Sequence, residues 1–273
     1  MLDKLSNLQQ RIITGLSGAA LLVIGIWYSD WSYFGVFAVI AMLSLIEFYK
    51  LVALAGISVE KKTGSIGGLL LFAGTFLFEK EYIGSEFLFL LFPYLFLLFI
   101  FILFQNVEKP FEKMAYTLLG IFYVTVPFSL FTMIAFHTGE YVPEVVFGIL
   151  IIIWGNDIGG YIAGVTLGKH KLYARISPKK TWEGTLGGVV LGVSASIVLS
   201  LFFTSMTTWT WFMIASIIVV FGSLGDLIES MLKRSLAVKD SGTLIPGHGG
   251  FLDRFDGLIF ALPFVAAYII VFT

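Results

Sequence analysis

The sequence contains no cysteine and very little charge. The absence of cysteine from all 273 residues excludes a disulfide framework, a thiolate metal site and a cysteine nucleophile. Any metal ion must therefore be held by carboxylates or histidines. Only 13% of the residues are charged, and 17 Lys and Arg residues balance 18 Asp and Glu residues. This balance excludes the global basic field with which proteins bind nucleic acid.

The sequence also lacks a long polar segment in which a separate soluble domain could form. Hydrophobic residues make up 58% of the chain, well above the proportion in soluble domains. We therefore expect one integral membrane domain over residues 1–273. Its chemistry must be carried out by the membrane helices and by the loops that join them.

Apolar runs of the length that crosses a bilayer recur along the whole chain. A hydrocarbon core of about 30 Å requires about 20 apolar residues in a helix. The sequence thus predicts an all-α polytopic membrane protein, a bundle of about nine transmembrane helices. The predicted spans are 12–28, 31–55, 63–78, 87–103, 114–136, 145–167, 184–203, 209–232 and 256–272.

The basic residues are distributed very unevenly between the two sides that these spans define. Every Lys and Arg residue except Lys80 falls in the N-terminal segment, in an even-numbered loop or, in the case of Lys50, in the last turns of the span that leads into such a loop. Because basic loops stay in the cytoplasm, we expect a cytoplasmic N-terminus and a C-terminus on the opposite side. The predicted location is a bacterial-type cytoplasmic (inner) membrane.

The sixth predicted span contains two polar residues, Asn156 and Asp157, among closely spaced glycines. Small residues at this spacing most often let two helices approach closely. They can also mark a broken helix at a binding site. The sequence favours packing and leaves the second interpretation open. The glycines are Gly155, Gly159, Gly160 and Gly164.

Acidic residues are predicted to gather at the cytoplasmic ends of the last three spans. Asp226, Asp253 and Asp256 could form an all-oxygen pocket for Mg²⁺ or Mn²⁺, with room for a second cation. The structural alternatives are an ion pair of Asp226 with Lys233 or Arg234, and an N-terminal helix cap by Asp253. Glu229 and Lys233, four residues apart, are expected to pair on one helix face.

Two basic segments border these acids and could bind phosphate groups. Most lysines beside a membrane are topology signals or contacts to anionic lipid. However, Lys179 and Lys180 lead directly into the seventh span, and the glycine-rich turn 246–250 offers backbone amides that could hold phosphate oxygens. His248 in this turn could be a general acid or a loop residue bonded to the backbone.

The segment from Ser230 to Asp256 resembles the signature of the phosphatidate cytidylyltransferase (CDP-diacylglycerol synthase) family. It reads S-x-L-K-R-x4-K-D-x-G-x2-I-P-x-H-G-G-F-x-D-R-F-D without a gap. Residues 169–172 and 176–184 resemble a second region of that family. Residues 1–140 resemble it only as apolar helices, and Asp157-Ile158-Gly159 departs from the family pattern.

The resemblance implies an enzyme that condenses CTP with phosphatidic acid to give CDP-diacylglycerol and pyrophosphate, with a divalent metal. It implies an active site in residues 141–273, facing the cytoplasm, and lipid-facing scaffold helices in residues 1–140. The implied catalytic residues are Asp226, Asp253, Asp256, Lys233 and Arg234, the three acids also being the metal ligands. The implied substrate-binding residues are Lys179, Lys180, Lys239, Asp240, His248, Gly249, Gly250, Arg254 and Asp157. A homodimer through glycine-rich helix faces is also compatible with the sequence.

Two other kinds of protein share some of these features. A CDP-alcohol phosphotransferase is disfavoured because Asp256-Gly257 continues as Leu-Ile-Phe-Ala and lacks the DGx2AR core. A secondary transporter would explain Asp157 in a glycine-interrupted span. It fits less well because the acids gather at one membrane face and because no inverted repeat is evident.

Overall fold

The computed structural model describes residues 7–238 and 249–273 of the chain. The chain divides into two compact units. The first unit comprises Met1–Met133 and Ser235–Arg254, and the second comprises Ile134–Arg234 and Phe255–Thr273. Residues 235–238 and 249–254, the described part of this stretch of the signature sequence, therefore belong with the N-terminal helices.

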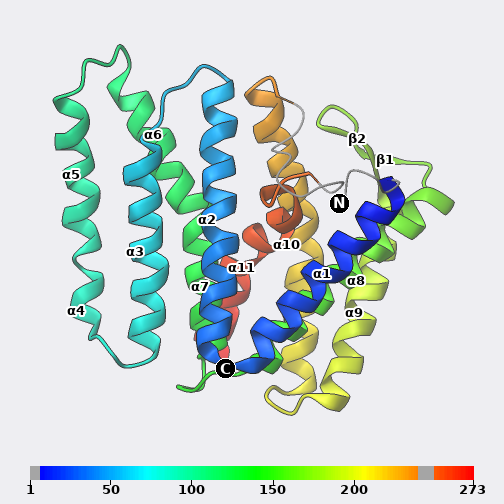
Figure 1. Cartoon of the computed structure of the whole chain (residues 1–273). Helices are drawn as coiled ribbons and strands as arrows, with labels where there is room; N and C mark the ends of the chain where they lie inside the picture. The colour runs from blue at the N-terminus through cyan, green and yellow to red at the C-terminus, as the bar shows by residue number, and fades with distance from the viewer. Residues whose placement is uncertain (1–6, 239–248) are drawn as a thin grey trace. The chain divides into compact units, whose positions relative to one another are not determined.

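The first unit is a group of helices in which α2 and α3 lie side by side and α5 packs against α3 (Figure 1). A π-helical turn, η2, precedes α7, where Pro127 cannot donate a backbone hydrogen bond. The elements are α1 (Asn7–Tyr28), α2 (Asp30–Leu54), α3 (Lys61–Glu79), α4 (Ser85–Leu88), α5 (Leu91–Leu103), α6 (Pro110–Gly120) and η2 (Ile121–Thr125), followed by α7 (Val126–Ala135), which runs into the second unit.

The second unit contains the remaining long helices and a short hairpin of two strands. Helices α8 and α9 pack along one another (Figure 1). The elements are α8 (Pro143–Thr166), β1 (Lys171–Tyr173), β2 (Ser177–Thr181), α9 (Trp182–Phe202), α10 (Thr208–Ser235) and α11 (Leu252–Phe272), whose first residues belong to the first unit.

The predicted all-α architecture is confirmed. In the described part of the chain, nine helical segments correspond to the nine predicted spans. Seven of them are long and apolar enough to cross a membrane. They are Asp30–Leu54, Ser85–Leu103, Pro110–Ala135, Pro143–Thr166, Trp182–Phe202, Thr208–Ser235 and Leu252–Phe272. The β-hairpin is a feature that the sequence did not predict.

The glycines of the sixth predicted span bring α8 and α9 into backbone contact. A methyl group added at Gly159 would collide with the carbonyl oxygen of Gly187. One added at Gly184 would lie 2.9 Å from the carbonyl oxygen of Gly160. Because α8 continues unbroken from Pro143 to Thr166, the packing interpretation is confirmed and the broken helix is not found.

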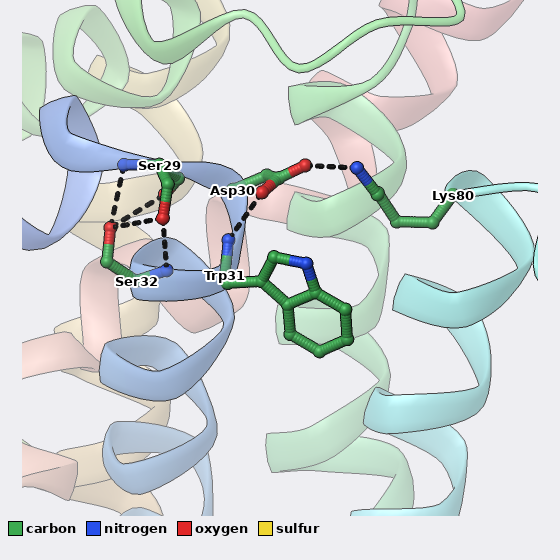
Figure 2. Close-up of polar contacts among 5 residues, drawn as sticks. All are labelled: Ser29, Asp30, Trp31, Ser32 and Lys80. Carbon is green, nitrogen blue, oxygen red and sulfur yellow. Dashed lines mark hydrogen bonds and ion pairs between the residues drawn. The ribbon is translucent and has the colours of Figure 1, made fainter.

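The turn between α1 and α2 is fixed by polar contacts and by an ion pair to α3 (Figure 2). The Ser29 and Ser32 side chains form a capping box at the start of α2. Asp30 Oδ1 accepts a hydrogen bond from the Trp31 N–H at 2.7 Å, and Asp30 Oδ2 pairs with the Lys80 ammonium. This hydrogen bond to Asp30 raises the pKa of Lys80. The pair therefore ties the start of α2 to the end of α3.

We expect Lys80→Met to lower the free energy of unfolding by less than about 1 kcal/mol, because both partners are partly exposed to solvent. Thermal unfolding of the purified protein in detergent measures this change. The difference should shrink further at high salt, which screens the pair. A loss that is large and independent of salt would contradict this account.

Candidate active site

The basic segment after α8 folds as an antiparallel hairpin that leads directly into α9. The Thr181 hydroxyl caps α9 by accepting a hydrogen bond from the Gly184 N–H at 3.1 Å. The hairpin and the cap together fix Lys179 and Lys180 at the start of α9. Of these two side chains, Lys179 is exposed and Lys180 is half-buried.

Lys180 joins the hairpin to the end of α10. Its ammonium lies 2.7 Å from Asp226 Oδ2, and it also donates a hydrogen bond to the Ser223 carbonyl oxygen at 3.1 Å. From the sequence, Lys233 and Arg234 were the candidate ion-pair partners of Asp226. The ion pair observed in the structure is instead formed by Lys180, 46 residues earlier in the chain.

Two carboxylates from α8 and α10 lie within electrostatic reach of Asp256 on α11, and all three acids belong to the second unit. The Asp256 carboxylate interacts with those of Asp226 and Asp157. It also interacts with the Lys180 ammonium, and its Oδ1 accepts a hydrogen bond from the Gly257 N–H at 2.7 Å. We call Asp157, Lys180, Asp226 and Asp256 the acidic cluster. The structure thus brings together four of the predicted site residues.

A close helix crossing explains why Asp226 and Asp256 are near each other. A methyl group added at Gly225 would lie 2.7 Å from the carbonyl oxygen of Asp256 and 3.0 Å from the Cα of Gly257. Only glycine at position 225 lets the backbones of α10 and α11 approach this closely. Asp226 follows at the next position, so the crossing fixes the spacing of the two acids.

The composition of the acidic cluster suits a hard divalent cation. Its donors are carboxylate oxygens, the ligands that Mg²⁺ prefers, and one ammonium leaves a net negative charge among three acids. Across residues 7–238 and 249–273, no three acidic or histidine side chains are already assembled as a metal site. The Lys180 ammonium pairs with Asp226 Oδ2, one of the candidate ligand oxygens.

The other basic residues at the end of α10 differ in their surroundings. The Lys233 ammonium lies 2.9 Å from Glu229 Oε2, so the predicted helix-face pair is confirmed. The Glu229 side chain is buried, whereas Arg234 is exposed. Of the two predicted catalytic cations, Arg234 is therefore the more accessible to a phosphate in solution.

Among the remaining described residues of the signature sequence, Gly249 and Gly250 precede α11, and Asp253 and Arg254 lie in its first turn; all four belong to the first unit. Asp253 is in the first turn of a helix that begins at Leu252, so it does not occupy the cap position. Arg254 is exposed, Gly250 is buried, and Gly249 has a φ of +86°, which favours glycine. The predicted residues Lys239, Asp240 and His248 lie outside the described residues.

Glu183, in the first turn of α9, organises the entry to the hairpin. Its Oε1 lies 2.6 Å from His170 Nδ1, and its Oε2 accepts a hydrogen bond from the Lys169 N–H at 3.1 Å. The acid therefore holds the loop that precedes β1. It does not belong to the acidic cluster that the other contacts define.

Sequence reasoning missed one residue that contacts the signature segment. Glu47 Oε2 accepts a hydrogen bond from the Leu252 N–H at 2.9 Å, and both residues belong to the first unit. The available signal was an acidic residue inside the otherwise apolar predicted span 31–55. Its partner lies 205 residues later, so spacing could not reveal the contact.

The relatives of this chain that are described below carry the same protein name. The chain matches the sequence profile of the cytidylyltransferase family over residues 9–272. The phosphatidate cytidylyltransferase of Bacillus subtilis is 33% identical over 266 residues, which are 95% of this chain and 96% of that protein. The proteins of the same name from Staphylococcus epidermidis and Mycobacterium leprae are 40% identical over 154 residues (56% of this chain, 58% of that protein) and 46% identical over 114 residues (42% and 36%).

Proposed function

Because the chain belongs to the cytidylyltransferase family, we infer that it is a phosphatidate cytidylyltransferase. It condenses CTP with phosphatidate to give CDP-diacylglycerol and pyrophosphate. The observation that carries this conclusion is the match to the Bacillus subtilis enzyme along nearly the whole of both chains. The protein is a multi-pass membrane protein, in keeping with the lipid nature of one substrate and of the product.

We place the reaction at the acidic cluster and the basic residues around it. An oxygen of the phosphatidate phosphate forms a bond to the α-phosphorus of CTP, while the bond from that phosphorus to the pyrophosphate oxygen breaks. The attacking phosphate is already anionic, so no strong base is needed. Catalysis then depends on positioning and on neutralising negative charge.

Lys180 is the cation best placed to bind the triphosphate, because it is half-buried and stands among the acids. It can exchange Asp226 for a phosphate oxygen when substrate arrives. Lys179, Arg234 and Arg254, whose side chains are exposed, are proposed as further phosphate contacts. The sequence adds Lys233, Lys239, Asp240, His248, Gly249 and Gly250 to the proposed catalytic and substrate-binding set.

We assign Mg²⁺, or Mn²⁺, to Asp226 and Asp256, with Asp253 as the third predicted ligand and room for a second cation. The support is the all-oxygen donor set and the excess of negative charge in the acidic cluster. When bound, the metal supplies charge neutralisation to the triphosphate and the leaving pyrophosphate. Asp157 is proposed to shape the electrostatic field beside these ligands.

Metal binding can be measured without substrate. Mg²⁺ alone should raise the melting temperature of the wild-type protein, because a ligand of the folded state stabilises it by about 2.7 kcal/mol at 100 times its dissociation constant. Asp256→Asn should lose most of this rise. EDTA should abolish turnover, and added Mg²⁺ or Mn²⁺ should restore it. An equal rise in both proteins would contradict the assignment of Asp256.

The orientation in the membrane is also a proposal: nine spans, a cytoplasmic N-terminus, and an active site facing the cytoplasm of a bacterial-type inner membrane. The distribution of Lys and Arg supports it. Since the chain has no cysteine, single cysteines can be labelled cleanly. In intact cells, Tyr82→Cys should react with an impermeant maleimide, and Lys62→Cys should react only after lysis. Labelling of Lys62→Cys in intact cells would overturn this orientation.

A homodimer stays a prediction. The α8 glycines that suggested a dimer are packed against α9 of the same chain, so a dimer would have to use another surface. The mass of the protein in nanodiscs measures its oligomeric state.

The decisive experiment for the function is a turnover assay with purified protein, CTP, phosphatidate and Mg²⁺. CDP-diacylglycerol and pyrophosphate should appear in equal amounts. The absence of both products from an intact, folded protein would refute the enzyme assignment. Flux of a solute into liposomes without CTP would instead favour the transporter.

A further inference from the structure

Glu47 is a buried carboxylate in α2, and it lies outside every motif identified in the sequence. Its side chain is 1% exposed and sits among the buried residues Ser44, Phe48 and Leu51. A charged or strongly polar group buried in an apolar helix is costly unless it has partners. The partners of Glu47 therefore indicate why an acid stands there.

The described partners of Glu47 are backbone N–H groups at the start of α11. Oε2 accepts from the Leu252 N–H at 2.9 Å, and the Phe251 N–H lies within electrostatic reach of this carboxylate. Among the residues that the structure describes, none donates a hydrogen bond to Oε1. Glu47 thus directs its hydrogen bonding to a single backbone segment.

The sequence around Leu252 explains why that segment needs help from another helix. The first N–H groups of a helix lack partners within the helix, and a Ser, Thr, Asp or Asn before the first turn normally supplies one. Here the residue before Leu252 is Phe251, which has no acceptor in its side chain. Glu47 takes the place of the missing cap.

The same contact lies next to a residue of the proposed site. Asp253, which follows Leu252, interacts electrostatically with Glu47, and Lys50 does so with the opposite sign. Asp256 follows one turn further along α11, about 4.5 Å along the helix axis from Asp253. A shift at the start of α11 would therefore move both acids.

We propose that Glu47 is a positioning residue for cytidylyl transfer: by holding the first N–H groups of α11, it fixes Asp253 and Asp256 for the reaction. This inference rests on the proposed function. It assigns a part in the reaction to the N-terminal helices, which the sequence predicted to be only a scaffold.

The test compares variants of Glu47 that separate hydrogen bonding from burial. Glu47→Leu removes both acceptor oxygens and leaves the Leu252 N–H without this partner, a loss of about 1 to 3 kcal/mol. Glu47→Gln keeps an acceptor oxygen at nearly the same place. Ser44→Ala, one turn earlier on the same buried face, is the matched control. The readouts are kcat, the KM for CTP and the melting temperature.

We expect Glu47→Leu to fold with a lower melting temperature than wild type, and its kcat, measured well below that temperature, to fall about 10- to 100-fold, because small misplacements of reacting groups have effects of this size. The KM for CTP should change much less. Glu47→Gln should recover kcat to within a few-fold of wild type, and Ser44→Ala should match wild type. Where Glu47→Leu fails to fold, Glu47→Met keeps the unbranched shape and replaces it in the comparison.

Two results would overturn the proposal: a folded Glu47→Leu or Glu47→Met with wild-type kcat, or a Glu47→Gln as inactive as Glu47→Leu. Failure of the proposed function looks different. In that case, wild-type protein makes no CDP-diacylglycerol at all. If wild type is active and the folded Glu47→Leu or Glu47→Met variant has the same kcat, the positioning role fails while the proposed function stands.

Discussion

Asp226→Asn should lower kcat/KM for CDP-diacylglycerol formation at least about 100-fold, the scale on which removal of one preorganised electrostatic group slows an enzyme. The substitution removes one negative charge and one metal ligand of the proposed site while keeping the shape of the side chain. Lys180 retains its hydrogen bond to the Ser223 carbonyl, so the hairpin should stay attached to α10. Release of pyrophosphate from CTP and phosphatidate measures the loss.

The matched control is Glu108→Gln, the same change from acid to amide on an exposed residue between α5 and α6. It should keep wild-type turnover. The melting temperature of Asp226→Asn should stay close to that of wild type, because Asp226 is only half-buried. Full activity in Asp226→Asn would remove the acidic cluster from the reaction.

Gly159→Ala should strongly destabilise the packing of α8 against α9. The added methyl group would collide with the backbone of Gly187, and backbone cannot move aside as a flexible side chain can. Overpacking of this kind costs about 1 to 3 kcal/mol. We expect a lower melting temperature and a smaller yield of folded protein from detergent extracts.

Gly155→Ala, one turn earlier on α8, provides a sharp comparison. A methyl group there would lie 3.5 Å from the Leu191 carbonyl oxygen, an ordinary contact. Since alanine favours helix over glycine by about 1 kcal/mol, this variant should be as stable as wild type or more stable. Equal destabilisation of the two variants would show that close packing of α8 on α9 is not the cause.

The helices could be predicted from sequence because bilayer thickness sets their length. An apolar run of about 20 residues crosses the bilayer as a helix, and charged or turn-forming residues mark its two ends. The nearness of Asp226 and Asp256 was also foreseeable, because orientation alone assigns both to the same membrane face. These inferences need no knowledge of which helices pack together.

The partner of Lys180 could not be predicted, because it depends on tertiary packing. Strands of three and five residues have little stability alone. In addition, Pro178 and the two lysines that follow it are residues typical of a loop, so the sequence of β2 does not indicate a strand. Once the hairpin forms, it carries Lys180 to Asp226 on α10. Basic residues in a loop therefore looked alike in the sequence, although only some of them approach the acids.

The hydrogen bond between Glu47 and Leu252 also has a consequence for synthesis of the chain. At about 5 to 20 residues per second, a ribosome needs roughly 10 to 40 s to make the 205 residues that separate them. During this interval α2 is already in the membrane, and its carboxylate still lacks these N–H donors. Nascent chains that stop before Leu252 keep a costly polar group inside the bilayer, a difference that membrane proteases can use to remove incomplete molecules.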